Sequence, residues 1–154
     1  MQNQQPPTGE KAYVQLMIIW FAMLVAQFIF LLVIFLVKPE VLQFDFNKPL
    51  LGNEPVIVII LALIGLINFI LSIYLSRKYI NQAIEKQNPL LVQTGMIIGC
   101  ALAESISLFG FVLAFAFDYQ YFFLWFGLGI LGVVLNFPKR ENFQSASYKN
   151  IQKF

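Results

Sequence analysis

Glu104 is the residue whose type and position most clearly suggest chemistry. It follows seventeen uncharged residues and precedes thirteen more, within the stretch GCALAESISLFG. A carboxyl group in the middle of a membrane helix costs about 2.5–3.5 kcal/mol to insert, and such groups face a helix bundle or a water path. Burial disfavours the charged form, so we expect a protonated carboxyl unless a bound cation lies beside it. The position predicts a role in ion handling or in helix contacts.

Other polar side chains could complete a site around Glu104. Ser107 lies one turn along the same helical face, and Ser105 is the next residue in the chain. Three polar residues of neighbouring apolar segments could form hydrogen bonds across a helix interface: Gln27, Asn68 and Ser72. The predicted ion-binding set is Glu104, Ser105, Ser107 and Asn68.

Small residues recur every fourth position in the segment that contains Glu104. They are Gly95, Gly99, Ala103 and Ser107. This spacing allows two membrane helices to approach closely. We therefore expect Gly95, Gly99 and Ala103 to pack against another helix. The stripe borders the face of Glu104, so the carboxyl group is predicted to lie at this contact and away from lipid.

The sequence offers no set of residues for catalysis or metal binding. It has no histidine, which removes the commonest general base and transition-metal ligand. Its one cysteine, Cys100, lies in an apolar run, where a reactive thiolate is unfavourable. The string GLGILG at 127–132 lacks the strand and the later acid of a dinucleotide-binding turn, so helix packing explains it better. We expect no enzyme activity, no cofactor and no metal.

The composition predicts an integral membrane protein. The 154 residues are 59% hydrophobic and 12% charged, against roughly 25% charged in a typical soluble domain. A soluble core of this size cannot bury that much apolar surface. The net charge is only +2 and the basic residues are scattered, which argues against a nucleic-acid partner. The expected partner is the lipid bilayer.

Apolar segments predict an all-α fold with four transmembrane helices. They cover residues 13–37, 56–75, 90–117 and 121–137. About 20 apolar residues suffice to cross the hydrocarbon. The first segment is too long for a cleaved signal sequence, so we expect it to be retained. Residues 1–12 then form a polar N-terminal tail, and residues 138–154 a basic tail that is either a short interfacial helix or disordered.

The basic residues predict that both termini are cytoplasmic. The N-terminal segment, the connection after the second span and the C-terminal tail together carry eight Lys and Arg residues, and the other connections carry two. Cytoplasmic segments carry the excess of Lys and Arg. The loop at 38–55 then lies outside, where we expect a solvated connector rather than a metal site. A bacterial inner membrane or a plasma membrane suits four helical spans.

Residues 76–117 resemble the proteolipid subunit c of rotary ATP synthases. The resemblance is carried by AIEKQNPLLVQTGMIIGCALAESISLFGFVLAF, with its polar loop at 86–89 and its Ala-x-x-Glu carboxylate at Ala101 and Glu104. It implies that the glutamate binds the transported ion and that the loop faces the cytoplasm. Sodium-binding members add a Ser after the Glu and a Tyr five positions beyond it. Ser105 matches the first and Phe109 replaces the second, so the resemblance favours protons.

The chain also departs from the subunit c pattern. The family's first helix carries a run of alternating glycines, whereas the segment at 56–75 has one. Two further predicted spans flank the similar hairpin.

Two functions follow from this pattern. In the first, Glu104 takes part in proton or cation translocation as a subunit c-like component of a homo-oligomer or a larger membrane complex. In the second, the protein is structural or binds a partner, and a protonated Glu104 fixes helix packing by hydrogen bonding. The first is the primary prediction, because intramembrane acids are functional by default.

Overall fold

The computed structural model describes residues 9–43, 45 and 47–147, and this part of the chain is helical and contains no strand. Its elements, in chain order, are α1 (Gly9–Val37), η1 (Pro39–Leu42), α2 (Pro55–Lys86), α3 (Pro89–Phe117), α4 (Phe122–Leu135) and α5 (Arg140–Ser147). Four segments are long and apolar enough to cross a membrane, with α4 and α5 counted together as the fourth. The predicted all-α fold with four candidate spans is confirmed.

Helix α2 is longer than the predicted span at 56–75, and residues assigned to a connection continue the helix to Lys86. No proline or glycine interrupts the sequence there. The helix ends where Gln87 adopts a left-handed conformation with φ 52°. Asn88 then caps α3 by accepting a hydrogen bond from the Leu90 N–H at 3.1 Å, and Pro89 occupies the first helical position. The left-handed Gln87 favours the end of α2, and the Asn88 cap with Pro89 favours the start of α3.

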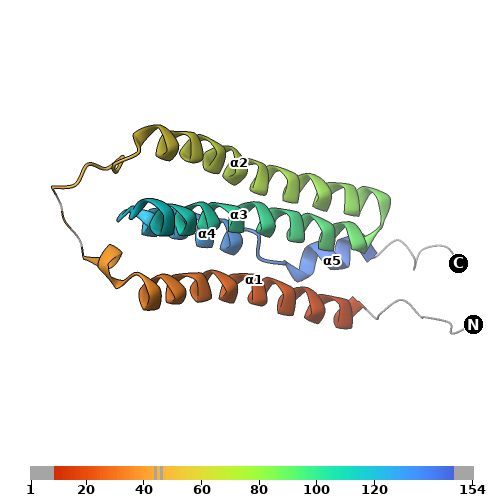
Figure 1. Cartoon of the computed structure of the whole chain (residues 1–154). Helices are drawn as coiled ribbons and strands as arrows, with labels where there is room; N and C mark the ends of the chain where they lie inside the picture. Colours follow the sequence, from red (N-terminus) through yellow and green to blue (C-terminus); the bar gives the residue numbers. More distant parts are fainter. Residues whose placement is uncertain (1–8, 44, 46, 148–154) are drawn as a thin grey trace, which may run out of the picture.

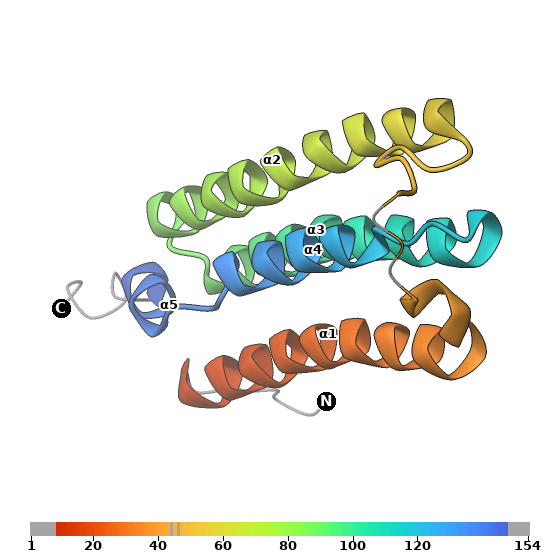
Figure 2. The same ribbon diagram turned by 90° about the vertical axis from the view of Figure 1, so that its left-hand side faces the viewer.

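Helix α3 is the centre of the bundle. It contacts α1, α2, α4 and α5, and α1 and α2 lie on opposite sides of the pair formed by α3 and α4 (Figures 1 and 2). The start of α1, the α2–α3 turn and α5 lie at one end of the bundle, which we call the terminal end (Figure 1). The connector at 38–54 and the α3–α4 turn lie at the other, the connector end.

The predicted packing residues of α3 meet two different helices. A Cβ atom added at Gly95 would lie 3.1 Å from the Ser76 carbonyl oxygen of α2, and one added at Gly99 would lie 3.1 Å from that of Ser72. Ala103 faces α4 instead, because a Cβ atom added at Gly132 would lie 2.7 Å from the Ala103 Cβ. The small residues therefore bring α3 close to α2 and to α4.

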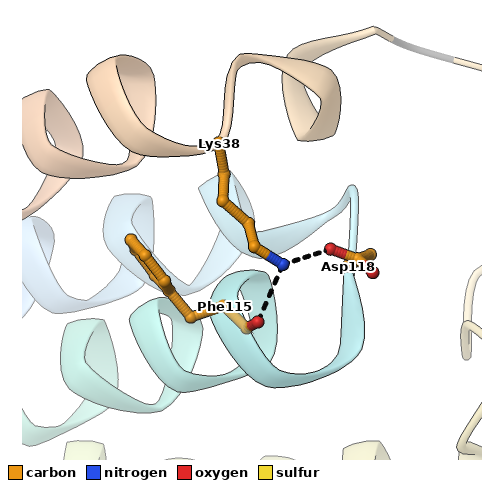
Figure 3. A network of polar contacts seen from close by, with 3 residues as sticks. All are labelled: Lys38, Phe115 and Asp118. Atoms are coloured by element: carbon orange, nitrogen blue, oxygen red, sulfur yellow. Dashed lines mark hydrogen bonds and ion pairs between the residues drawn. The ribbon is translucent and has the colours of Figure 1, made fainter.

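At the connector end, an ion pair joins chain segments that are distant in sequence (Figure 3). The Lys38 Nζ donates to Asp118 Oδ1 at 2.5 Å and to the Phe115 carbonyl oxygen at 2.9 Å. Phe115 lies in the last turn of α3, whose carbonyl groups have no partner within the helix. Lys38 thus joins the end of α1 to the end of α3.

The described residues of the loop at 38–55 are mostly exposed, as expected of a solvated connector, and hydrogen bonds also anchor the loop to the α3–α4 turn. The Gln120 side chain donates to the Asp45 carbonyl oxygen at 2.8 Å and accepts from the Asp45 N–H at 3.2 Å. The Tyr119 hydroxyl donates to the Leu50 carbonyl oxygen at 2.9 Å. Tyr119 and Gln120 are buried, so the turn forms a small polar core under the loop.

The close approach of α3 and α4 gives the first prediction. A Cβ atom added at Gly129 would collide with the Ser107 hydroxyl and lie 3.0 Å from the Ala103 carbonyl oxygen, whereas one added at Gly127 meets nothing within 4 Å. Gly129→Ala should therefore lower the free energy of unfolding by about 1–3 kcal/mol, and Gly127→Ala should not lower it. Thermal unfolding of both variants in detergent would measure this difference. Equal midpoints would show that α3 and α4 do not approach this closely.

Candidate functional site

Glu104 lies near the middle of α3, on a flank of the bundle. It is the sixteenth of the helix's 29 residues, about 22 Å from its first residue at 1.5 Å per residue. Its side chain is half-buried, and Ala101 and Leu108, which share its face one turn away, are exposed. The carboxyl group is therefore only partly screened by the chain, whereas the sequence predicted a position away from lipid.

The described part of the chain supplies no hydrogen-bond or ion-pair partner for this carboxyl group. Within the described residues, Glu104 makes no hydrogen bond and no ion pair, and no group of three or more His, Cys, Asp or Glu residues could hold a metal ion. A carboxyl group without a partner in hydrocarbon is costly in the charged form. In the isolated chain the neutral form is therefore the favourable one.

Ser105 and Asn68 form a contact between α2 and α3 beside Glu104. The Asn68 Nδ2 donates to Ser105 Oγ at 2.8 Å, and Ser105 Oγ donates to the Leu102 carbonyl oxygen at 2.7 Å. The Ser105 hydroxyl group therefore donates its proton within α3 and accepts a hydrogen bond from Asn68 of α2. This pair joins two helices and leaves Glu104 out.

Ser107 forms a second contact, with Gln27 of α1. The Ser107 Oγ donates to Gln27 Oε1 at 2.6 Å, and both side chains are fully buried. The Gln27 Nε2 atom is buried without a hydrogen-bond partner. An unpaired buried donor costs about 1–3 kcal/mol. The α1–α3 contact therefore carries an unsatisfied polar group, on the side of α3 away from Asn68.

The structure does not bring the predicted ion-binding set into one shell. At about 100° per residue, Ser105 and Ser107 project to opposite sides of Glu104, by about 100° and 60°. Each is already bonded to a different neighbouring helix. Asn68 is hydrogen-bonded to Ser105. The Glu104 carboxyl group therefore lies between two interhelical hydrogen bonds, Asn68–Ser105 and Ser107–Gln27, and takes part in neither.

Asn136 is a buried polar residue that the sequence analysis did not select. Its Nδ2 donates to Ser72 Oγ and to the Gly132 carbonyl oxygen, each at 2.8 Å, and Ser72 Oγ donates to the Gly99 carbonyl oxygen at 2.8 Å. This network ties α2, α3 and the end of α4 together. In the sequence, Asn136 is a polar residue at the end of an apolar run, just before Phe137 and Pro138. That position could have indicated a side chain that satisfies carbonyl groups at a helix end.

Helix α4 ends early, and side chains satisfy its last carbonyl groups. Its 14 residues reach about 21 Å, less than the 30 Å of a typical hydrocarbon core. Trp20 Nε1 donates to the Val133 carbonyl oxygen at 2.8 Å, beside the Asn136 bond to the Gly132 carbonyl oxygen. Such bonds allow a helix to end where water is scarce. Within the predicted fourth span, 121–137, helix α4 covers only Phe122–Leu135, and the candidate span in the structure continues through α5.

Comparisons with protein-family models, with curated proteins and with solved structures found no match to the chain.

The Gln27–Ser107 contact gives the second prediction. Ser107→Ala should lower the free energy of unfolding by about 1–3 kcal/mol, because both polar groups of the Gln27 side chain are then buried without partners. Gln27→Met should cost less, since it also removes the unsatisfied Nε2. The double variant should recover most of the loss caused by Ser107→Ala. A double-mutant cycle of unfolding in detergent measures this coupling, and purely additive effects would contradict the contact.

Proposed function

We propose that the protein is a proton-exchanging component of a membrane assembly, in which Glu104 takes up and releases a proton near the middle of the bilayer. The observation that carries this proposal is the position of Glu104, half-buried on the outer flank of α3 with no polar partner among the described residues. Intramembrane acids are costly and are typically functional. A carboxyl group on a flank can be reached from a neighbouring chain.

The geometry favours a proton over a metal cation as the exchanged species. A sodium or calcium ion needs several oxygen ligands around one point, as in the six to eight taken by calcium. Ser105 and Ser107 are bonded to separate helices on opposite sides of Glu104. A proton needs the carboxyl group alone. The same preference is implied by Phe109, which stands where sodium-binding subunit c proteins have a tyrosine.

The exposed flank of Glu104 supports an assembly rather than a lone chain. Leu108 and Val112, on the same side of α3, are 40% and 49% exposed. Lipid can cover these apolar groups, but it offers no hydrogen bond to a carboxyl group at this depth. A second copy of this chain or another membrane subunit would supply the missing polar contact. Homo-oligomer and hetero-complex both satisfy this requirement.

The alternative function is a structural or partner-binding role in which a permanently protonated Glu104 donates a hydrogen bond to a neighbouring chain. Interhelical hydrogen bonds within the chain are made by Gln27, Asn68, Ser72 and Asn136 without Glu104. A packing role for Glu104 would therefore act between chains. In that case Glu104→Gln should be nearly silent, because an amide still donates, whereas Glu104→Leu should loosen the assembly.

Carbodiimide labelling of native membranes, read by mass spectrometry of the Glu104 peptide, separates these functions. Only the protonated carboxyl reacts, so labelling should fall as the pH rises if Glu104 exchanges its proton with water. Glu104→Gln removes the reactive carboxyl group and should abolish labelling of this peptide at every pH. Protection by sodium would contradict a proton as the exchanged species. Labelling that requires denaturation would contradict exchange altogether and support the structural role.

The orientation of the bundle is part of the proposal, with the terminal end in the cytoplasm of a bacterial inner or plasma membrane. Most of the described basic residues lie at the terminal end: Lys11, Arg77, Lys78, Lys86, Lys139 and Arg140. The connector end has Lys38 and Lys48. Such an excess marks the cytoplasmic side.

Cysteine labelling of intact cells tests this orientation. An impermeant maleimide should modify Asp45→Cys, at the connector end, and should leave Gln82→Cys, at the terminal end, unmodified until the cells are opened. Both variants would be made with Cys100→Ala, which removes the native thiol. The reverse pattern would invert the proposed topology.

A further inference from the structure

A cavity of about 180 Å³ lies at the terminal end of the bundle, between α2, α3 and the junction of α4 with α5. Since a water molecule in the liquid occupies roughly 30 Å³, the cavity has room for a phosphate group. Its polar lining is contributed by Ser76, Arg77, Asn136, Lys139 and Asn142. It is distinct from Glu104, which is not among its lining residues.

The lining carries two cations and no acid. Arg77 and Lys139 come from different elements, and both side chains are exposed. Within the described part of the chain neither side chain makes an ion pair or a hydrogen bond. Two like charges beside one cavity repel each other, and an anion between them would remove that cost. An Arg guanidinium binds a phosphate through two parallel N–H groups.

The cavity lies where lipid headgroups are expected. Arg77 is the first charged residue after the apolar run of α2, and Lys139 is the first after α4. The Trp20 and Phe137 rings meet edge to face with centroids 5.0 Å apart beside the cavity, and aromatic residues favour the membrane interface. The two cations therefore mark the boundary between hydrocarbon and water.

The remaining walls of the cavity connect it to the lipid-facing surface. Leu135 and Phe137 line it and are 57% and 42% exposed. A soluble phosphate would gain nothing from these apolar groups. A phospholipid would place its phosphate between the two cations and the first part of its apolar region against Leu135 and Phe137. The lining therefore suits a ligand that is anionic at one end and apolar at the other.

We infer that this cavity binds the phosphate group of an anionic phospholipid of the leaflet at the terminal end, with Arg77 and Lys139 as its cationic ligands. Asn142 lies in the same lining and offers an amide donor to the headgroup. Basic pockets between transmembrane helices bind anionic headgroups in this way. An occupied site would also join α2 to the α4–α5 junction.

Native mass spectrometry of the full chain in detergent, with added phosphatidylglycerol or phosphatidylcholine, tests the site. We expect one phosphatidylglycerol to be retained per chain, in preference to phosphatidylcholine. The double variant Arg77→Gln/Lys139→Gln should bind it about thirtyfold more weakly, since each basic group contributes to attraction near the headgroups. The matched control Lys78→Gln/Arg140→Gln removes the same charge from neighbouring positions outside the cavity lining and should retain the lipid.

The conservative variant Arg77→Lys/Lys139→Arg should also retain the lipid, which separates loss of charge from misfolding. Equal losses in the two glutamine double variants would overturn the site, because they would show attraction to general positive charge alone. Equal retention of phosphatidylcholine would overturn it as well. Displacement of the lipid by millimolar inorganic phosphate would show that the cavity takes a soluble phosphate compound, and would overturn the lipid assignment.

Discussion

The close approach of α3 to both α2 and α4 is the contact on which the rest of the structure depends. Lipid is as apolar as a leucine side chain, so helix association in a membrane relies on packing and on hydrogen bonds rather than on exclusion of water. Gly95 and Gly99 bring α3 against the backbone of α2, and Gly129 and Gly132 bring α4 against Ala103 and Ser107. Because the backbones are close, short side chains such as Ser72 can reach carbonyl groups of the next helix.

These short distances also explain why the polar residues of the bundle form pairs. Asn68 reaches Ser105, Gln27 reaches Ser107, and Asn136 reaches Ser72. The hydrogen bond of each pair joins two helices. Glu104 lies between two of them and takes part in neither, so the one acid of the predicted spans remains available to another molecule. Each of these amide side chains makes at least one hydrogen bond to another helix, whereas the Glu104 carboxyl group makes none among the described residues, and this contrast supports a function outside the chain's own packing.

The two ends of the bundle differ in their chemistry. At the connector end, Lys38 forms an ion pair with Asp118, and the Gln120 side chain is hydrogen-bonded to the Asp45 backbone. At the terminal end, Arg77 and Lys139 face a cavity without a described acidic partner. The basic cavity at the terminal end and the exposed flank of α3 are the two surfaces on which the proposed lipid and protein partners would bind.

The sequence by itself determined the all-α class, the four apolar segments and the prominence of Glu104, because hydrophobic length and an isolated charge are local properties of the chain. The hydrophobic pattern did not predict the extension of α2 to Lys86, because the residues that extend it are polar and charged. It did not predict the early end of α4 either, because the Asn136 hydrogen bonds at that end join residues that are distant in sequence. Only the tertiary structure decided which face of α3 meets which helix. That geometry paired Ser105 and Ser107 with different helices and brought Arg77 and Lys139 to the lining of one cavity. The physical reason is that helical spacing fixes which residues share a face of one helix. Which face then meets which neighbouring helix depends on how closely the helix backbones can pack.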